Sequence, residues 1–227
     1  MDILLLDTET TSTDPATGLL LEVAFARYSL AHGLVGVRST LVRHTTLPDD
    51  FGYDVHGIAR DLLIGERPSV ADAGTLVYGA ATQTAEPLPI VAWNADFDRA
   101  WFPAQEQALP WVDAMDLEWP RRPTSRGLAA TALAHGVGVV TAHRAAPDVM
   151  TMVALFDRAR ELGADLGAMV AKGLRPRARF QALVSFDDRD KAKAEGFRWE
   201  AETKRWLRTM AIEDAAALPF ATREVTR

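Results

Sequence analysis

The chain has 227 residues, of which 48% are hydrophobic and 25% charged, so it can form one domain of catalytic size with a small appendage. With no cysteine and only five histidines, disulfide frameworks, thiolate metal sites and cysteine nucleophiles are excluded, and any metal is expected on oxygen ligands. The net charge is −6, but residues 174–210 carry ten Lys/Arg against six Asp/Glu (+4), which leaves fifteen against twenty-five (−10) elsewhere.

No apolar run approaches the roughly 18 residues that span a bilayer. The N-terminal sequence Met-Asp-Ile-Leu-Leu-Leu lacks the basic flank and the small-residue cleavage site of a signal peptide. We therefore expect a cytoplasmic protein.

Residues 1–162 show a mixed order of strands and helices. The patterns predict strands at 2–8, 20–30, 34–44, 89–93 and 111–115, and helices from 69 and at 94–108, 126–135 and 145–162. A tight connection around His32 and Gly33 indicates an antiparallel hairpin, and the later strands alternate with helices. This order predicts an α/β fold in which a β-meander continues into a parallel portion of the sheet.

The C-terminal part is a separate small module. Residues 163–177 read as a short helix and linker, followed by a strand at 180–186, a helix at 188–195 and a hairpin at 197–207. The predicted domains are therefore 1–173 and 174–227, the second a β-α-β-β unit.

Two carboxylates follow the first strand. Side chains alternate along an extended backbone, so Asp7 and Glu9 lie on the same side. Their mutual repulsion is relieved if a divalent cation such as Mg²⁺ or Mn²⁺ lies between them. The alternative is a strand end that reaches solvent.

Three further candidates lie near helix starts. Asp98 follows the possible cap Asn94, and it shares a helix face with Trp101 and Phe102, which directs it inward. His143 and Asp148 flank the start of the last long helix. When each position is considered alone, capping and the helix dipole are the favoured explanation.

Four segments together resemble one enzyme family. They are Asp-Thr-Glu-Thr-Thr at 7–11, Val-His-Gly-Ile at 55–58, Trp-Asn-Ala-Asp-Phe-Asp at 93–98 and His-Arg-Ala-Ala-Pro-Asp at 143–148. In order and spacing they are similar to the motifs of the DEDDh 3′–5′ exonucleases, in the DnaQ-like superfamily of polymerase proofreading subunits and exonuclease X. Trp93 departs from the usual histidine. His32, His44 and His135 match no motif position and are expected in loops or at the surface.

The resemblance implies an RNase H-like five-stranded mixed sheet flanked by helices. It also implies that Asp7, Glu9, Asp98 and Asp148 hold two divalent cations, Mg²⁺ or Mn²⁺, that clamp a scissile phosphate. His143 would be the general base. The implied function is a 3′–5′ exonuclease that releases nucleoside monophosphates from DNA ends, with a single strand or 3′ end as its partner.

Substrate contacts are implied by the same resemblance. Thr10 and Thr11 would lie beside the terminal nucleotide, and His56, Gly57 and Ile58 would contact its base or sugar. Asn94 of the second motif belongs to the same predicted group. The open alternatives are that the threonines only favour the strand and that Ile58 belongs to the core.

The C-terminal module combines basic and aromatic residues, a composition that suits phosphate contact and base stacking. Trp199 and Trp206 are therefore predicted to bind nucleic acid. The alternative is that they face each other across the hairpin as the core of the module.

Two other functions remain open. A ribonuclease of the same family would act on RNA 3′ ends or short oligoribonucleotides, since contacts to the 2′-hydroxyl cannot be identified from these motifs. A catalytically silent nucleic-acid-binding adaptor would keep the fold without turnover.

Overall fold

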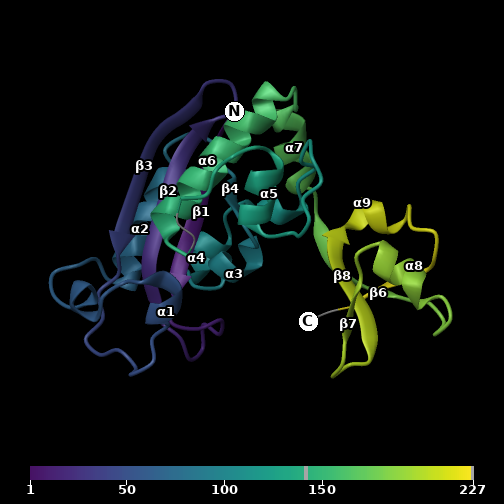
Figure 1. The fold of residues 1–227 in the computed structure, drawn as a ribbon, viewed down its shortest axis with the longest axis horizontal. Coiled ribbons are helices and arrows are strands. Elements are labelled where there is room, and N and C mark those ends of the chain that lie inside the picture. The colour runs from purple at the N-terminus through teal and green to yellow at the C-terminus, as the bar shows by residue number, and fades with distance from the viewer. Residues whose placement is uncertain (141–142, 226–227) are drawn as a thin grey trace. The chain divides into compact units, whose positions relative to one another are not determined.

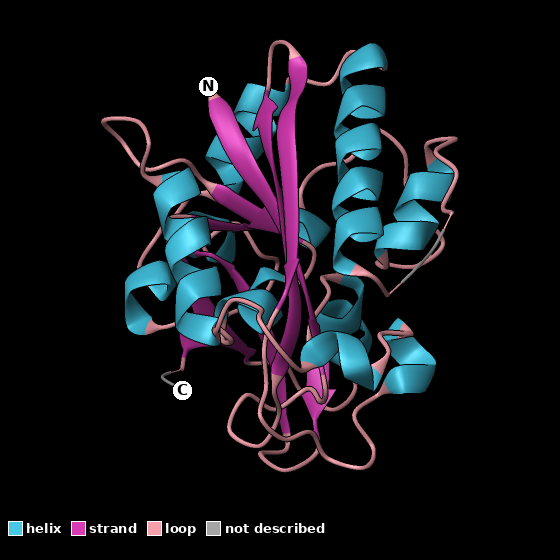
Figure 2. Cartoon of the chain, turned by 90° about the vertical axis from the view of Figure 1, so that its left-hand side faces the viewer, coloured by secondary structure: helices cyan, strands magenta, loops and turns pink. Residues whose placement is uncertain are grey.

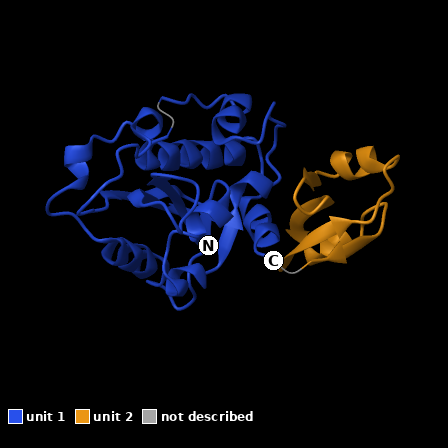
Figure 3. Cartoon of the chain, turned by 90° about the horizontal axis from the view of Figure 1, so that it is seen from below, with its two compact units in different colours: residues 1–174 blue, residues 175–227 orange. Residues whose placement is uncertain are grey.

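The structure, a computed structural model, describes residues 1–140 and 143–225. It contains two compact units, Met1–Leu174 and Arg175–Arg227, which Figure 3 shows in different colours. None of the described helices is both long and apolar enough to cross a membrane.

The first unit is built on a five-stranded mixed sheet (Figure 1). Its spatial order is β3 (Gly33–Leu41), β2 (Leu20–Ser29), β1 (Asp2–Thr10), β4 (Ile90–Ala92) and β5 (Trp111–Asp113). The first three strands are antiparallel, as the hairpin predicted, and β4 and β5 run parallel to β1. The α/β class and the mixed five-stranded sheet expected from the sequence are confirmed.

Helices cover both faces of this sheet (Figure 2). Alternation along β1 sends Ile3 and Leu5 into a core with α6 (Ala145–Glu161) and α7 (Leu166–Gly173). The intervening Leu4 and Leu6 pack in a second core that includes residues of α2 (Val70–Ala81). Burial of both faces explains why β1 is almost continuously apolar up to Asp7.

The single helix expected over 94–108 is broken. The structure has α3 (Ala95–Arg99) and α4 (Ala104–Gln107), with Pro103 as the residue before α4. Proline has no backbone N–H and its ring clashes with the preceding turn, so it ends one helix and begins the next. The other short helices are α1 (Tyr53–His56), η1 (Arg60–Leu63), η2 (Ala114–Asp116) and α5 (Leu128–Ala134).

His135 is fully buried, so its expected place at the surface or in a loop was wrong. Its Nδ1 lies 2.7 Å from the carbonyl oxygen of Thr131, and its Nε2 accepts the backbone N–H of Arg121 at 3.1 Å. A histidine that uses both ring nitrogens can be buried without leaving a polar atom unpaired.

The second unit is a four-stranded antiparallel sheet with two short helices. The spatial order is β7 (Arg198–Glu200), β8 (Arg205–Ala211), β6 (Arg177–Ala182) and β9 (Thr222–Glu224). The helices are α8 (Arg189–Ala194) and α9 (Ile212–Ala215). The sequence predicted the first three strands and α8, whereas α9 and the edge strand β9 are additions.

Candidate active site

The alternation of β1 places Asp7 and Glu9 on the sheet face that packs against α6. Their apolar predecessors on that face, Ile3 and Leu5, belong to the core formed with α6. Glu9 is buried and Asp7 is half-buried. Two carboxylates are therefore held at the end of a rigid central strand, where neither is freely solvated.

The first turn of α6 brings a third carboxylate to the same place. One ligand oxygen from each of Asp7, Glu9 and Asp148 lies within 4.8 Å of the others. The Oδ2 atom of Asp148 accepts the backbone N–H of His143 at 3.0 Å, which fixes the side chain at the start of the helix. The sheet and α6 thus converge on a compact acidic group.

The environment of this group opposes negative charge. Burial, followed by the charges of Asp148 and Glu22, raises the pKa of Glu9 to about 8. Burial and the charge of Asp98 hold the pKa of Asp7 well above its usual range, and burial also raises the pKa of Asp148. Carboxylates in this setting ionise together only when a positive charge joins them, and oxygen ligands favour hard divalent cations.

Asp98, from α3, is 1% exposed and lies beside this group rather than within it. Its Oδ1 accepts the hydroxyl of Thr8 at 2.7 Å. Its Oδ2 is buried and has no hydrogen-bond partner among residues 1–140 and 143–225. Burial raises the pKa of Asp98 to about 7. A buried carboxylate oxygen without a partner is an available ligand for a cation.

His143 is exposed and has a left-handed backbone, with φ of 62°. This conformation is uncommon for a residue other than glycine, and it costs on the order of 1–3 kcal/mol. The hydrogen bond from its backbone N–H to Asp148 helps to hold it. Residues 141–142, just before it, lie outside the described part of the chain.

Sequence reasoning missed an ion pair that supports the site. Glu22 of β2 is 2% exposed, and it accepts hydrogen bonds from Arg144 Nε at 2.9 Å and from Ser39 Oγ at 3.0 Å. It also accepts the backbone N–H of Ala145 at 3.3 Å. A lone carboxylate in the apolar strand Leu20–Ser29 was the available signal.

The two predicted substrate threonines fix the loop after β1. Thr10 donates its hydroxyl to the carbonyl oxygen of Ser12 at 2.7 Å, and the Thr11 hydroxyl accepts the Leu19 N–H at 2.9 Å. Both hydroxyls therefore hold the chain that returns to β2.

The turn at residues 56–58 is built around a buried ring. His56 is 3% exposed; its Nε2 lies 2.8 Å from the carbonyl oxygen of Phe51, and its Nδ1 accepts the Ile58 N–H at 3.0 Å. Ile58 is 1% exposed in a local core with Leu21 and Phe51. The exposed member of the predicted trio is Gly57, whose φ of 64° suits glycine.

Asn94 is exposed just before α3 and has a left-handed φ of 69°. Its side chain makes no capping bond, although its backbone N–H donates to Asp113 Oδ1 at 3.0 Å. The neighbouring Trp93 donates its indole N–H to the carbonyl oxygen of Arg126 at 2.9 Å. The Asn94 amide is not used to cap the helix.

Trp199 and Trp206 lie opposite each other on β7 and β8, with ring centroids 5.7 Å apart. Trp199 is 51% exposed, whereas Trp206 is half-buried against the core of the second unit. Of the two, Trp199 presents the larger surface to a ligand.

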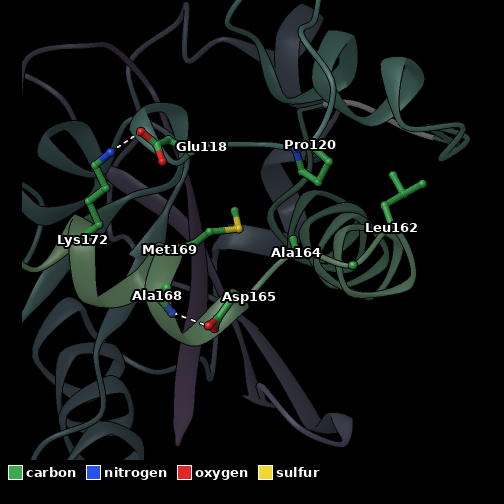
Figure 4. A pocket seen from close by; sticks show the side chains of 9 residues that line it. Glu118, Pro120, Leu162, Ala164, Asp165, Ala168, Met169 and Lys172 are labelled. Carbon is green, nitrogen blue, oxygen red and sulfur yellow. Dashed lines mark hydrogen bonds and ion pairs between the residues drawn. The ribbon is translucent and has the colours of Figure 1, made fainter.

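Figure 4 shows a pocket near the turn from α6 to α7 in the first unit. The pair Lys172–Glu118 lies at its wall, and Asp165 accepts the Ala168 N–H at 2.9 Å as the cap of α7. These polar groups already have partners, and no member of the acidic group lines the pocket.

Comparisons with known proteins agree with this fold. Residues 178–225 match a family model described as "Domain of unknown function (DUF8626)", and no curated protein matches the chain. The first unit's fold is that of known exonucleases. A structure of Exonuclease X with 5′ overhanging duplex DNA is similar at 25% identity and a TM-score of 0.57, over 74% of this chain and 98% of that one.

Structures of E. coli Exonuclease I are also similar. The complex with a dT13 oligonucleotide matches at 17% identity and a TM-score of 0.58 over 81% of this chain. A zinc-bound complex with single-stranded DNA matches at 16% identity and a TM-score of 0.59 over 80% of this chain. The chain spans about half the length of Exonuclease I, 48% in the dT13 complex.

Proposed function

We propose that the first unit is a metal-dependent 3′–5′ exonuclease of the DEDDh type that releases nucleoside monophosphates from DNA. The observation that carries this proposal is the convergence of Asp7, Glu9 and Asp148 within 4.8 Å beside the unpaired Oδ2 of Asp98. The likeness to Exonuclease X, whose structure contains DNA, supports a nuclease acting on DNA.

The donor set fits divalent cations. Asp7, Glu9, Asp98 and Asp148 offer only carboxylate oxygens, the ligands that Mg²⁺ and Mn²⁺ prefer. Cations held there would supply positive charge that offsets both the carboxylates and a phosphodiester. Burial raises the pKa values of Glu9 and Asp98, and a cation held there would favour the ionised form of both carboxylates.

We assign the proton transfer to His143. The residue is exposed and its backbone N–H donates to Asp148 of the acidic group, and its imidazole would accept a proton from the attacking water. The water oxygen would then bond to phosphorus while the bond from phosphorus to the 3′ oxygen of the preceding nucleotide breaks. That oxygen would take a proton from solvent, which leaves a 3′-hydroxyl on the shortened strand and a free nucleoside 5′-monophosphate.

Digestion of matched DNA and RNA oligonucleotides, labelled at either end, tests the proposal. With Mg²⁺ or Mn²⁺, we expect 5′-labelled single-stranded DNA to shorten one nucleotide at a time, while 3′-labelled DNA releases a labelled mononucleotide immediately. Faster loss of RNA than of DNA would indicate the ribonuclease alternative. Binding without turnover would indicate the silent adaptor.

A further inference from the structure

The two faces of the C-terminal sheet differ in what covers them. Alternate residues of β6, Phe180 and Ala182, pack in the core of this unit with Met210 of β8. Ala192 of α8 and Ala215 of α9 belong to the same core, so both helices cover this face. The residues that alternate with the core residues lie on the other face, which we call the open face. Leu207 and Ala211 on this face are buried, whereas its arginines Arg198, Arg205 and Arg223 are exposed.

The open face is rich in arginine. Register places Arg179 opposite Thr209, Arg198 opposite Leu207, Arg205 opposite Glu200 and Arg223 opposite Gln181, and Arg177 is two residues before Arg179 on β6. Among the strand residues of this face, all of them described, five arginines stand against one acidic residue, Glu200, a balance of +4.

The two segments that cover the other side of the sheet carry a net negative charge. Residues 186–195, which include α8, carry three basic and four acidic side chains, a balance of −1. The helix α9 adds Glu213 and Asp214. The positive charge of the module is therefore concentrated on one face of the sheet.

Because the positive charge lies on one face of the sheet, the residues best placed to contact the phosphates of a nucleic acid are not the two tryptophans predicted from the sequence. Trp199 and Trp206 pair with each other in register, and Trp206 packs against the core under the helices. The open-face arginines alternate with the tryptophans along the strands, so the two sets point to opposite faces. Arg208 lies on the helix-covered face, opposite Phe180, where it donates to the carbonyl oxygen of Glu195. The open face can contact phosphates, while base stacking on the tryptophans would have to occur elsewhere.

We propose that the open face binds the sugar–phosphate backbone of single-stranded DNA, an inference that rests on the proposed function because it supplies the same substrate. Arg198, Arg205 and Arg223 are exposed, and guanidinium groups bind phosphate through two parallel hydrogen bonds. Arg179 is held by Glu200 at 2.7 Å, and Arg177 donates to the carbonyl oxygen of Thr209 at 3.1 Å. Arg198, Arg205 and Arg223 are therefore the principal contacts.

The test compares two triple variants of the full chain that each remove three positive charges. R198Q/R205Q/R223Q changes the open face, and R189Q/K191Q/K193Q changes α8 on the opposite side. Binding of a fluorescent 30-nucleotide single strand is measured by anisotropy in chelator over a range of salt concentrations. Each phosphate contact adds about 0.7 to the slope of log affinity against log salt.

We expect the open-face variant to weaken binding and to lower that slope by about 2, and the α8 variant to leave the slope nearly unchanged. Equal losses of affinity in both variants would mean that binding depends on net charge rather than on the open face, which would contradict the proposal. Unchanged affinity in the open-face variant would overturn it. A larger loss in W199A than in the open-face variant would instead place the strand on the aromatic side. Circular dichroism shows whether each variant is folded.

Cleavage of a dinucleotide with Mg²⁺ separates this inference from the proposed function. The open-face variant should cleave it at the wild-type rate, because the substrate is too short for extended backbone contacts. A wild-type chain that binds the long strand through the open face but never cleaves would contradict only the proposed function. A chain that cleaves, with unchanged binding in the open-face variant, would contradict only the open face.

Discussion

His143 combines two properties that can be separated by mutation, an imidazole ring and a left-handed backbone. Asparagine adopts positive φ more readily than most residues but cannot act as a base near neutral pH. H143N should therefore keep the φ of 62° and the hydrogen bond to Asp148 while losing the general base.

We expect H143N to slow cleavage by about 10²–10⁴-fold with DNA affinity nearly unchanged, as measured by single-turnover kinetics and by binding in Ca²⁺. H143A is the comparison, since it adds the backbone strain to the loss of the ring. Retained activity in H143N together with a large loss in H143A would assign the role to the backbone rather than to the imidazole.

Glu9 makes stability depend on pH. Its pKa rises from the usual 4.5 to about 8 in the folded chain, so the folded state binds its proton more tightly than the unfolded state. The stabilisation of the folded state by the protonated Glu9 side chain is fully present below pH 4.5 and is lost as pH rises through about 8.

E9Q should therefore become more stable than the wild type, by an amount that grows between pH 4.5 and 8 in chelator. Denaturant unfolding at several pH values measures the difference, and Mg²⁺ should stabilise the wild type more than E9Q. A difference that does not vary with pH would contradict the account of Glu9.

At the scale of elements, the Glu22–Arg144 pair joins β2 to the start of α6. The Glu22 side chain is 3% exposed and that of Arg144 35%, so the two partners are not equivalent. Removing Arg144 leaves a buried, unpaired carboxylate close to Glu9, whereas removing the charge of Glu22 leaves an arginine that water can reach.

We expect R144Q to lower the free energy of unfolding by about 1–3 kcal/mol and E22Q to lower it by less, as measured by thermal and denaturant unfolding in chelator. E22Q should also lower the pKa of Glu9, because the charge of Glu22 raises it. Equal losses in both variants would show that the pair contributes only packing.

Elements with local signals could be predicted from the sequence, and those set by distant contacts could not. The helix predicted from residue 69 begins there, where Ser69 and Asp72 form a capping box at the start of α2, and the β2–β3 hairpin has the predicted antiparallel pairing. By contrast, β9 has only three residues and pairs with β6, about forty residues earlier in the chain. A strand this short has no periodicity of its own.

In the candidate site, too, some features follow from local sequence and others depend on distant contacts. The motifs identified the carboxylates, and alternation along β1 explained why Asp7 and Glu9 share a face. Only the three-dimensional structure shows that Thr8, on the other face of β1, donates its hydroxyl to one oxygen of Asp98, and that Arg144 donates to Glu22. The buried environment that raises the pKa of Glu9 likewise depends on packing from distant parts of the chain.

In the whole molecule, the excess positive charge is concentrated in the second unit and, within that unit, on the open face of its sheet. The sequence gives residues 174–210 a balance of +4, but it does not show that the open-face arginines share one side of a sheet. If the first unit is the proposed nuclease, its acidic surface repels a polyanion away from the carboxylate group, and a tethered basic surface would raise the local concentration of long substrates.

In the proposed function, the carboxylates of β1, α3 and α6 hold cations that drive phosphodiester hydrolysis. The rate of mononucleotide release from single-stranded DNA in Mg²⁺, measured for the wild type and for D7N, tests this role most directly. We predict metal-dependent release by the wild type and a loss of several orders of magnitude in D7N, which remains folded. Release that persists in chelator, or that is undiminished in D7N, would contradict the claim.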